Sequence, residues 1–257
     1  MQPKGFYNEK QQLWMVLDSF WDRMTDQQLA EYASTCKANG QRPGIYWTPF
    51  SYWGNKDGFG NCVPGTNNKY TWGDIIITAG GEPRKVQSSF SVDPTHPGTL
   101  MMVDYYVNRF KDLGFEYIKL DFLNSGSIEA DKFYAEGVTT GMQAYNYGMN
   151  YLSQKFLEAG MFINLSIAPV FPTKYAHSRR ISCAAWGSMN DSEYVLNSLQ
   201  FSWWLDRLYV FNDPDEMCFE KFSYGENRIR QTTGVMMGTV LLADNYSRGG
   251  SYPGRQL

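Results

Sequence analysis

The stretch Glu116-Tyr117-Ile118-Lys119-Leu120-Asp121 is a short apolar segment that ends in a carboxylate, and we interpret it as a strand. Residues two apart in a strand point the same way, so Lys119 and Asp121 share one face, while Ile118 and Leu120 share the other. A Lys–Asp pair directed at one spot at the end of a strand indicates a functional site. In a βα-barrel, the C-terminal ends of the strands are where the chemistry takes place.

The segments around this strand alternate between strand and helix. Thr25 is a suitable N-cap for the first helix, and His96 is expected to have a structural role where the second helix begins. Such strict alternation implies a parallel sheet. Strands are predicted at residues 13–18, 44–49, 116–121, 161–166, 180–183, 208–211 and 240–243. Helices are predicted to end near residues 38, 113, 159, 204 and 237.

This α/β pattern fits a (β/α)₈ TIM barrel better than an open, doubly wound sheet. A doubly wound sheet usually carries a Gly-rich first βα turn for phosphate, and no such turn follows any predicted strand. A closed barrel needs roughly 250 residues, so the 257 residues allow one barrel domain over residues 1–257. Seven core strands are predicted rather than eight. We therefore expect the first βα unit of the barrel to lie outside this chain.

The core strands end in polar residues, which a closed barrel would gather on one face. These residues are Asp18, Thr48, Asp121, Ser166, Asn212, Asp213 and Asp244. A polar, Gly-rich insertion at about residues 51–92 interrupts the alternation and is expected on the loop side of the scaffold. It is predicted to hold a hairpin, with strands at 74–78 and 85–88 and with Gly80-Gly81 in the turn.

Composition narrows the possible partners. The net charge is −3 and the sequence has no basic stripe, so nucleic acid is not expected as a partner. No run of about 18 apolar residues predicts a membrane span, and the first residues lack the apolar core of a signal peptide. We nevertheless expect a secreted or periplasmic location rather than a cytoplasmic one.

The cysteine and histidine content argues against a metal site. The chain has four cysteines, none in a Cys-x-x-Cys pair, and two histidines, which makes a zinc site improbable. Two disulfides in an oxidising compartment and four unpaired thiols remain alternatives. No metal ion and no organic cofactor is implied. Aromatic residues make up 16% of the chain, which suits either a sugar site or a large aromatic core.

Four segments together resemble retaining α-galactosidases of glycoside hydrolase families 27 and 36. Tyr117–Phe122 is similar to the nucleophile strand of this clan, and Phe211–Met217 is similar to a Trp-Asn-Asp-Pro-Asp stretch of family 27. Trp14–Trp21 resembles an early strand that ends in Asp-Asp-x-Trp, and Gly44–Tyr46 matches the next strand. The four occur in the family's order. The residues after Asp121 are closer to family 36.

The resemblance implies a role for each matched residue. Asp121 would be the nucleophile of a retaining mechanism, which uses two carboxyl groups about 5–5.5 Å apart. Lys119 would keep Asp121 ionised and donate to a sugar hydroxyl. Asp18 and Asp213 would accept from sugar hydroxyls, although Asp213 is also a suitable turn residue before a proline. The remaining substrate-binding candidates are Arg180, which would bind a hydroxyl or orient the acid, and Trp47, Trp53 and Trp186, which would stack on a sugar or pack the barrel.

The second carboxyl group of the mechanism is missing. The family pattern Arg-x-x-x-Asp reads here from Arg180 to Ala184, and an alanine cannot give or take a proton. Our first interpretation is that Ala184 replaces an aspartate and inactivates the chain. A natural inactive homologue is the second interpretation. The third is that Asp191 has taken over the role, although Asp191 also suits the N-cap of the next helix.

These observations leave three functional hypotheses. The first is a retaining exo-glycosidase for terminal α-galactose, α-N-acetylgalactosamine or β-L-arabinopyranose, inactive in this form. The second is a non-catalytic barrel that binds carbohydrate. The third is a glycosidase of the same clan that acts on α-glucans. The segment Asn164–Pro169 does not match the family segment that selects the sugar, so the substrate stays open. In each hypothesis the partner is a carbohydrate.

Overall fold

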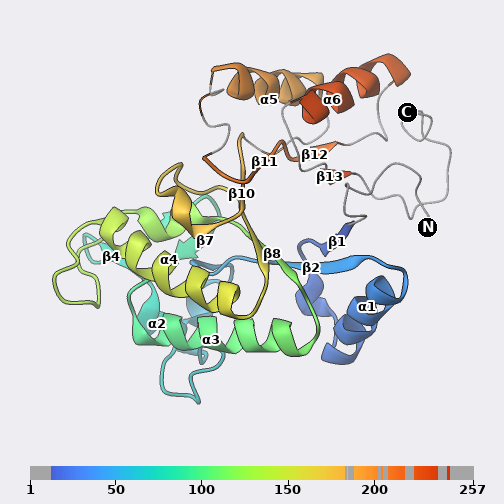
Figure 1. The fold of residues 1–257 in the computed structure, drawn as a ribbon. Helices are drawn as coiled ribbons and strands as arrows, with labels where there is room; N and C mark the ends of the chain where they lie inside the picture. Colours follow the sequence, from blue (N-terminus) through green and yellow to red (C-terminus); the bar gives the residue numbers. More distant parts are fainter. Residues whose placement is uncertain are drawn as a thin grey trace. The chain divides into compact units, whose positions relative to one another are not determined.

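A computed structural model describes residues 13–182, 184, 188–201, 204, 208–217, 223–236 and 242–243. The chain divides into two compact units, Met1–Tyr175 and Ala176–Leu257, which are described separately below. Figure 1 shows the order of their elements along the chain. The expectation that residues 1–257 form a single domain stays a prediction.

The first unit is built on a parallel sheet of four strands. In spatial order these are β1 (Trp14–Leu17), β2 (Arg42–Trp47), β8 (Tyr117–Leu120) and β9 (Phe162–Leu165). Each pairs with the next along its whole register (Figure 1). All four lie within two residues of the predicted strands, so the prediction of a parallel α/β sheet is confirmed for this unit.

Three long helices connect these strands, and each begins at a capping side chain. Helix α1 (Asp26–Ala38) starts after Thr25, whose hydroxyl accepts from the backbone N–H of Gln28 in a capping box. Helix α3 (Pro97–Asp112) starts after His96, whose Nδ1 accepts from a backbone N–H, so its predicted structural role is confirmed. Helix α4 (Gly141–Glu158) has its own capping box at its start. Short 3₁₀ turns η1 (Trp21–Arg23), η3 (Leu123–Ser127) and η4 (Thr173–Tyr175) complete the unit.

The insertion between β2 and α3 folds differently from the prediction. Residues 74–78 do not form one strand, because Thr71 and Asp74 make a capping box that starts the short helix α2 (Trp72–Ile75). A hairpin is present with Gly80-Gly81 in its turn, and both glycines have a positive φ. Its arms are residues 78–79 and 82–83, however, and the predicted second strand at 85–88 is wrong, because Lys85–Val86 pairs with Ser89–Phe90 instead. The other elements are β3 (Ser51–Tyr52), η2 (Lys56–Gly60), β4 (Thr78–Ala79), β5 (Glu82–Pro83), β6 (Lys85–Val86) and β7 (Ser89–Ser91).

Apolar side chains fill the side of the sheet that faces the helices. The register places Ile45, Ile118 and Ile163 in one row, and all three are fully buried. Trp47 lies in the next row, where its ring contacts Tyr106 and Phe110 of α3. Burying such side chains stabilises the fold by about 1.5–3 kcal/mol each. The opposite face of the strands is thereby left for polar side chains.

The second unit holds two parallel strand pairs and two helices. Strand β10 (Ser178–Arg180) pairs with β11 (Phe211–Asp213), and β12 (Glu216–Met217) pairs with β13 (Leu242–Ala243). The helices are α5 (Met189–Phe201) and α6 (Tyr224–Met236). Helix α5 begins three residues before the predicted start near Ser192.

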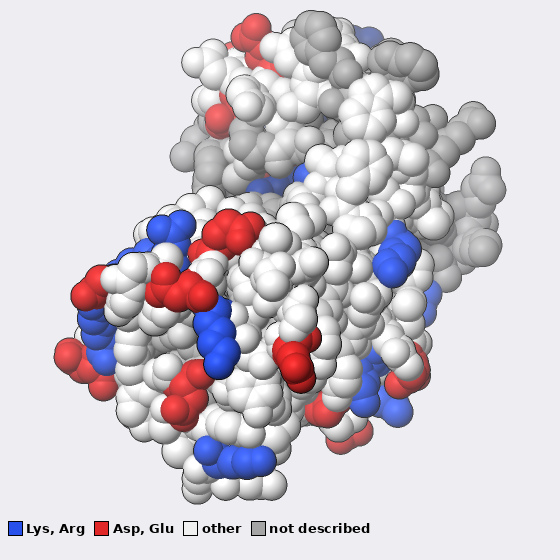
Figure 2. Space-filling model, turned by 90° about the vertical axis from the view of Figure 1, so that its left-hand side faces the viewer, with Lys and Arg blue, Asp and Glu red and all other residues white. Residues whose placement is uncertain are grey.

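The charged side chains at the surface agree with the lack of a basic stripe in the sequence. On the face shown in Figure 2, basic and acidic side chains are interspersed rather than gathered by sign. None of the described helices is long and apolar enough to cross a membrane. Cys36 and Cys62 are free thiols, while Cys183 and Cys218 lie outside the described residues.

Helix α4 offers a test of the packing in the first unit. A Cβ at Gly148 would lie 2.4 Å from Pro94 Cβ and 3.0 Å from the Pro94 carbonyl oxygen, both on a rigid part of the chain. We predict that Gly148→Ala lowers the free energy of unfolding by about 1–3 kcal/mol through overpacking. Urea denaturation followed by circular dichroism measures it. Gly225→Ala in α6 is the control, since nothing lies within 4 Å of its new methyl group. Equal behaviour of the two variants would contradict the packing argument.

Candidate functional site

One row of polar side chains crosses the inner face of the four-stranded sheet. Tyr46 is in register with Lys119, and Lys119 with Asn164. Asp18 follows β1 and continues the alternation of its strand, so it falls on the same face and beside Tyr46. Period-two alternation on adjacent parallel strands therefore brings together four side chains from distant parts of the sequence.

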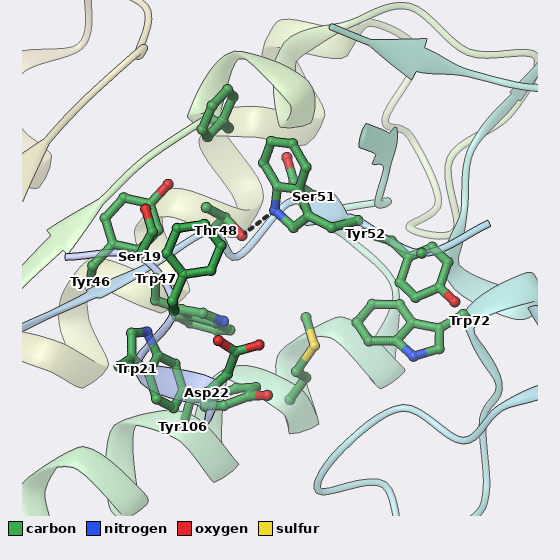
Figure 3. A pocket seen from close by; sticks show the side chains of 15 residues that line it. Ser19, Trp21, Asp22, Tyr46, Trp47, Thr48, Ser51, Tyr52, Trp72 and Tyr106 are labelled. Atoms are coloured by element: carbon green, nitrogen blue, oxygen red, sulfur yellow. Dashed lines mark hydrogen bonds between the residues drawn. The ribbon is translucent and has the colours of Figure 1, made fainter. Parts of the chain in front are cut away.

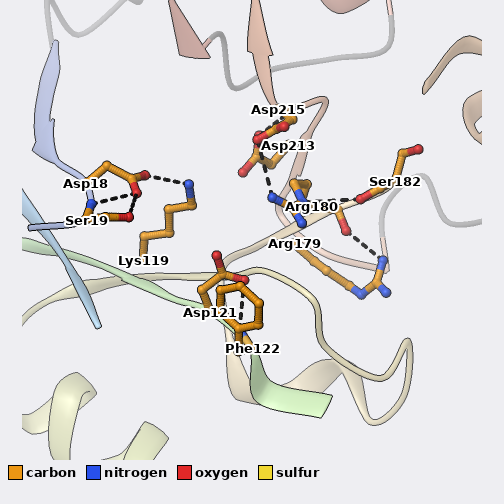
Figure 4. A network of polar contacts seen from close by, with 10 residues as sticks. All are labelled: Asp18, Ser19, Lys119, Asp121, Phe122, Arg179, Arg180, Ser182, Asp213 and Asp215. Carbon is orange, nitrogen blue, oxygen red and sulfur yellow. Dashed lines mark hydrogen bonds and ion pairs between the residues drawn. The ribbon is translucent and has the colours of Figure 1, made fainter. Parts of the chain in front are cut away.

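Lys119 and Asp18 form the ion pair of this row. The Nζ of Lys119 donates to Oδ2 of Asp18 at 2.7 Å (Figure 4). It also lies 5.6 Å from the centre of the Tyr46 ring. Lys119 is only 8% exposed, so its charge needs this partner. Burial alone would raise the pKa of Asp18, but Lys119 and two hydrogen bonds from Ser19 outweigh it and lower that pKa. The sequence paired Lys119 with Asp121; the structure pairs it with Asp18.

Asp121 lies one position beyond β8, at the carboxyl end of the sheet. It is 6% exposed, and its Oδ1 accepts from the backbone N–H of Phe122 at 2.8 Å (Figure 4). Tyr46, on the neighbouring strand, feels the charge of this carboxylate. Burial, followed by the charges of Asp121 and Asp18, raises the pKa of Tyr46, which keeps the hydroxyl protonated as a donor. Tyr46 was not predicted as a site residue. Its position opposite Lys119 on the neighbouring strand could have indicated it.

The loops after β1 and β2 enclose a cavity of about 610 Å³ beside this row (Figure 3). Trp47 borders it but is 7% exposed and packs against α3, so it serves the core more than a stacking surface. Trp53 is 48% exposed, and its indole N–H donates to the hydroxyl of Thr48 at 2.9 Å. The aromatic residues that line the cavity are Phe20, Trp21, Tyr46, Trp47, Tyr52, Trp53, Trp72, Tyr106 and Phe122.

The second unit places the remaining candidates around a buried arginine. Arg180 lies opposite Asp213 in the β10–β11 register, and its NH1 is 3.5 Å from Oδ1 of Asp215. Asp213 is fully buried and accepts from the backbone N–H of Asp215 at 2.8 Å (Figure 4). Asp215 is therefore the ion-pair partner of Arg180. Arg180 also donates to the carbonyl oxygen of Ser182.

The segment after β10 contains three further residues of the sequence-based predictions, Ala184, Trp186 and Asp191. Ala184 is half-buried, while Trp186 lies outside the described residues. Asp191 is not the N-cap of α5: Ser188 is, because its hydroxyl accepts from the N–H of Asp191 while the Asp191 carboxylate accepts from the N–H of Ser188. The Asp191 carboxylate is thus used in a capping box.

The described residues contain no group of three or more His, Cys, Asp or Glu side chains placed to hold a metal ion. The first unit has a carboxylate that accepts from a backbone N–H, and beside it an ion pair whose groups can bind hydroxyls.

No protein-family model matches the sequence, and a search of curated proteins finds no match. Solved structures, in contrast, are similar in fold. The α-galactosidase TtGalA from Thermus thermophilus, in complex with p-nitrophenyl α-D-galactopyranoside, matches with a TM-score of 0.66 and 19% identity over 91% of this chain and 52% of its own.

Two other glycoside hydrolases give comparable matches. A family GH27 β-L-arabinopyranosidase variant from Geobacillus stearothermophilus, in complex with arabinose, has a TM-score of 0.60 and 12% identity, over 84% of this chain and 52% of its own. An isomalto-dextranase from Arthrobacter globiformis T6, complexed with panose, has a TM-score of 0.57 and 17% identity, over 91% of this chain and 46% of its own.

At these identities the matches show the fold. The predicted fold class, the α/β architecture of barrel glycoside hydrolases, is confirmed. The chain spans about half the length of these three proteins.

The Lys119–Asp18 pair makes a testable electrostatic prediction. In Lys119→Met, the pKa of Asp18 should rise, because burial then acts without the opposing ammonium. NMR titration of the carboxyl carbon measures this shift. Since the folded pKa lies below the unfolded one, Asp18 stabilises the native state above the unfolded pKa, and this contribution is lost as pH falls through the folded pKa. The variant should lose this acid-side dependence.

Lys155→Met is the matched control, because Lys155 pairs with Asp104 on the helices and not with the row. It should leave the titration of Asp18 unchanged. An Asp18 titration that is the same in Lys119→Met and in the unmodified protein would exclude the ion pair as the cause.

Proposed function

We propose that the chain carries the site of a retaining exo-glycoside hydrolase for terminal α-galactosides or related sugars, with Asp121 as nucleophile. The observation that supports this most is the placement of Asp121: a buried carboxylate at the carboxyl end of a parallel strand, next to the row that contains Lys119 and Asp18. The fold shared with α-galactosidase and arabinopyranosidase structures is consistent with it.

The contacts of Asp121 suit nucleophilic attack. The Phe122 N–H binds Oδ1 and fixes the orientation of the carboxylate, and the nearby Tyr46 keeps its hydroxyl protonated because its pKa is raised. In the proposed first step, an oxygen of Asp121 attacks the anomeric carbon while the bond to the leaving oxygen breaks. Water then cleaves the glycosyl ester, which retains the configuration of the sugar.

The row beside the nucleophile would bind the sugar. Asp18 is the exposed end of the ion pair, with 54% of its side chain accessible, and its lowered pKa keeps it an acceptor for hydroxyls. Lys119 would hold Asp18 in place and donate to a second hydroxyl. We assign Arg180 and Asp213 to substrate binding as well, on the motif that they share with the clan.

Ala184 stands at the position that the motif gives to the acid/base aspartate. Without that carboxyl group, the leaving oxygen receives no proton and water is not activated. The loss of general acid/base catalysis corresponds to a factor of roughly 10²–10⁴ in rate. We therefore propose that this chain binds its substrate and turns it over slowly at best.

One alternative is supported by a specific observation. The similarity to an isomalto-dextranase complexed with panose is compatible with an α-glucan as substrate. A panel of aryl α-galactosides, α-N-acetylgalactosaminides, β-L-arabinopyranosides and α-glucosides separates the sugars. A barrel that only binds carbohydrate would hydrolyse none of them after an acid has been restored.

We predict that Ala184→Asp raises kcat for an aryl α-galactoside by about 10²–10⁴-fold, because it restores proton transfer in both steps. Nitrophenol release measures the gain. Adding Asp121→Asn to this variant should abolish the activity, since the nucleophile is then absent. Unchanged turnover in Ala184→Asp on the whole panel would reject the assignment of position 184.

The unmodified chain permits a complementary test. With a dinitrophenyl glycoside, whose leaving group departs without a proton, Asp121 should still form the glycosyl ester. Azide, which needs no general base, would attack the anomeric carbon, release Asp121 and give a glycosyl azide of retained configuration. Azide should accelerate the unmodified chain and have no effect on Ala184→Asp.

A further inference from the structure

The aromatic cavity of the first unit contains one charged side chain, and that side chain is unpaired. Figure 3 shows the carboxylate of Asp22 pointing into the cavity near Trp47 and Tyr106. Among the residues that the structure describes, Asp22 has neither an ion pair nor a hydrogen bond. The volume of the cavity, about 610 Å³, lies in the range typical of small-molecule sites.

The hydroxyl groups around the cavity are largely engaged within the protein. Ser19 donates to Asp18 at 3.0 Å, and Ser51 donates to Ser125 at 3.1 Å. Thr48 accepts from the Trp53 indole at 2.9 Å. A sugar needs several free donors and acceptors, and these groups already have partners. What the cavity offers is mainly aromatic surface, with one carboxylate and the phenol hydroxyls of Tyr52 and Tyr106.

The nearby cations do not neutralise Asp22. Arg109 lies 5.2 Å from the centre of the Trp21 ring, but Asp26 already holds it through two hydrogen bonds. Arg23 lies 4.5 Å from the Phe20 ring and makes no ion pair with Asp22. Both arginines show that the rings of this region accept cations on their faces.

From this arrangement we propose that the cavity is a binding site for an organic ammonium group. Indole and phenol rings attract a cation through their negative faces, and quaternary ammonium groups are recognised by such aromatic cages. Asp22 supplies the counter-charge, and Trp53 and Tyr106 supply aromatic walls. The site uses side chains other than Asp121, Lys119 and Ala184, so it does not depend on the proposed glycosidase activity.

Choline and its neutral isostere 3,3-dimethylbutan-1-ol test this site in the unmodified chain. They have the same shape, so only the charge distinguishes them. Choline should bind about tenfold more tightly, as measured by calorimetry and by the fluorescence of the tryptophans that line the cavity. Equal affinity for the two compounds, or no binding of either, would overturn the proposal.

Asp22→Asn should reduce the preference for choline while leaving the fold intact, because the side chain is exposed and makes no contact that the substitution breaks. Asp112→Asn, at the exposed end of α3, is the matched control and should bind choline normally. Trp53→Leu keeps apolar surface but removes an aromatic face, so it should weaken choline more than the alcohol. Galactose binding here in place of choline would make the cavity a sugar subsite and exclude the ammonium site.

Discussion

The register of four parallel strands is the constraint on which the site depends. Because side chains alternate with a period of two, the pairing of β1, β2, β8 and β9 places every second residue on the inner face. A shift of one residue in β8 would send Lys119 into the layer of helices and bring Ile118 and Leu120 to the polar row. The fully buried isoleucine row on the other face opposes such a shift, since exposing it would cost several kcal/mol. Core packing and site geometry are thus set by the same register.

The polar row also determines which charged groups of the site pair with one another. A lysine that is 8% exposed must be paired, and Asp18 meets that need at 2.7 Å. Asp121 accepts instead from the Phe122 N–H, which orients it without a formal charge. Phe122 has a φ of +52°, an uncommon conformation for a residue with a side chain, and it is this residue whose N–H meets the carboxylate. Strained backbone conformations of this kind cluster at active sites.

The sequence predicted what depends on local pattern and missed what depends on cross-strand neighbours. Strands and helices followed from alternation and caps, and His96 was correctly placed at the start of a helix. The sequence did not predict the partner of Lys119, because the alternation of side chains at i and i+2 describes a single strand only. Asp18 lies 101 residues away in the sequence, on the far side of Tyr46. Asp74 and Ile75 of the short helix Trp72–Ile75 were predicted to lie in a strand. That prediction followed the three successive isoleucines and missed the capping box that starts the helix. The cavity gave no sequence signal, because its walls come from segments that are far apart in the sequence, between Ser19 and Phe122.

The position of Ala184 separates binding from turnover in the proposed mechanism. The row and the proposed nucleophile come from β1, β2, β8 and the residues that follow them. Ala184 follows β10, in the second unit. In the proposed mechanism the side chain at 184 governs proton transfer, while Asp121 attacks and the Lys119–Asp18 pair binds the sugar. A chain with this division keeps the free energy of ground-state binding and loses only the interactions that belong to the transition state. It should therefore accumulate its complexes with sugars, and the identity of the bound sugar can be read from binding even where hydrolysis is absent.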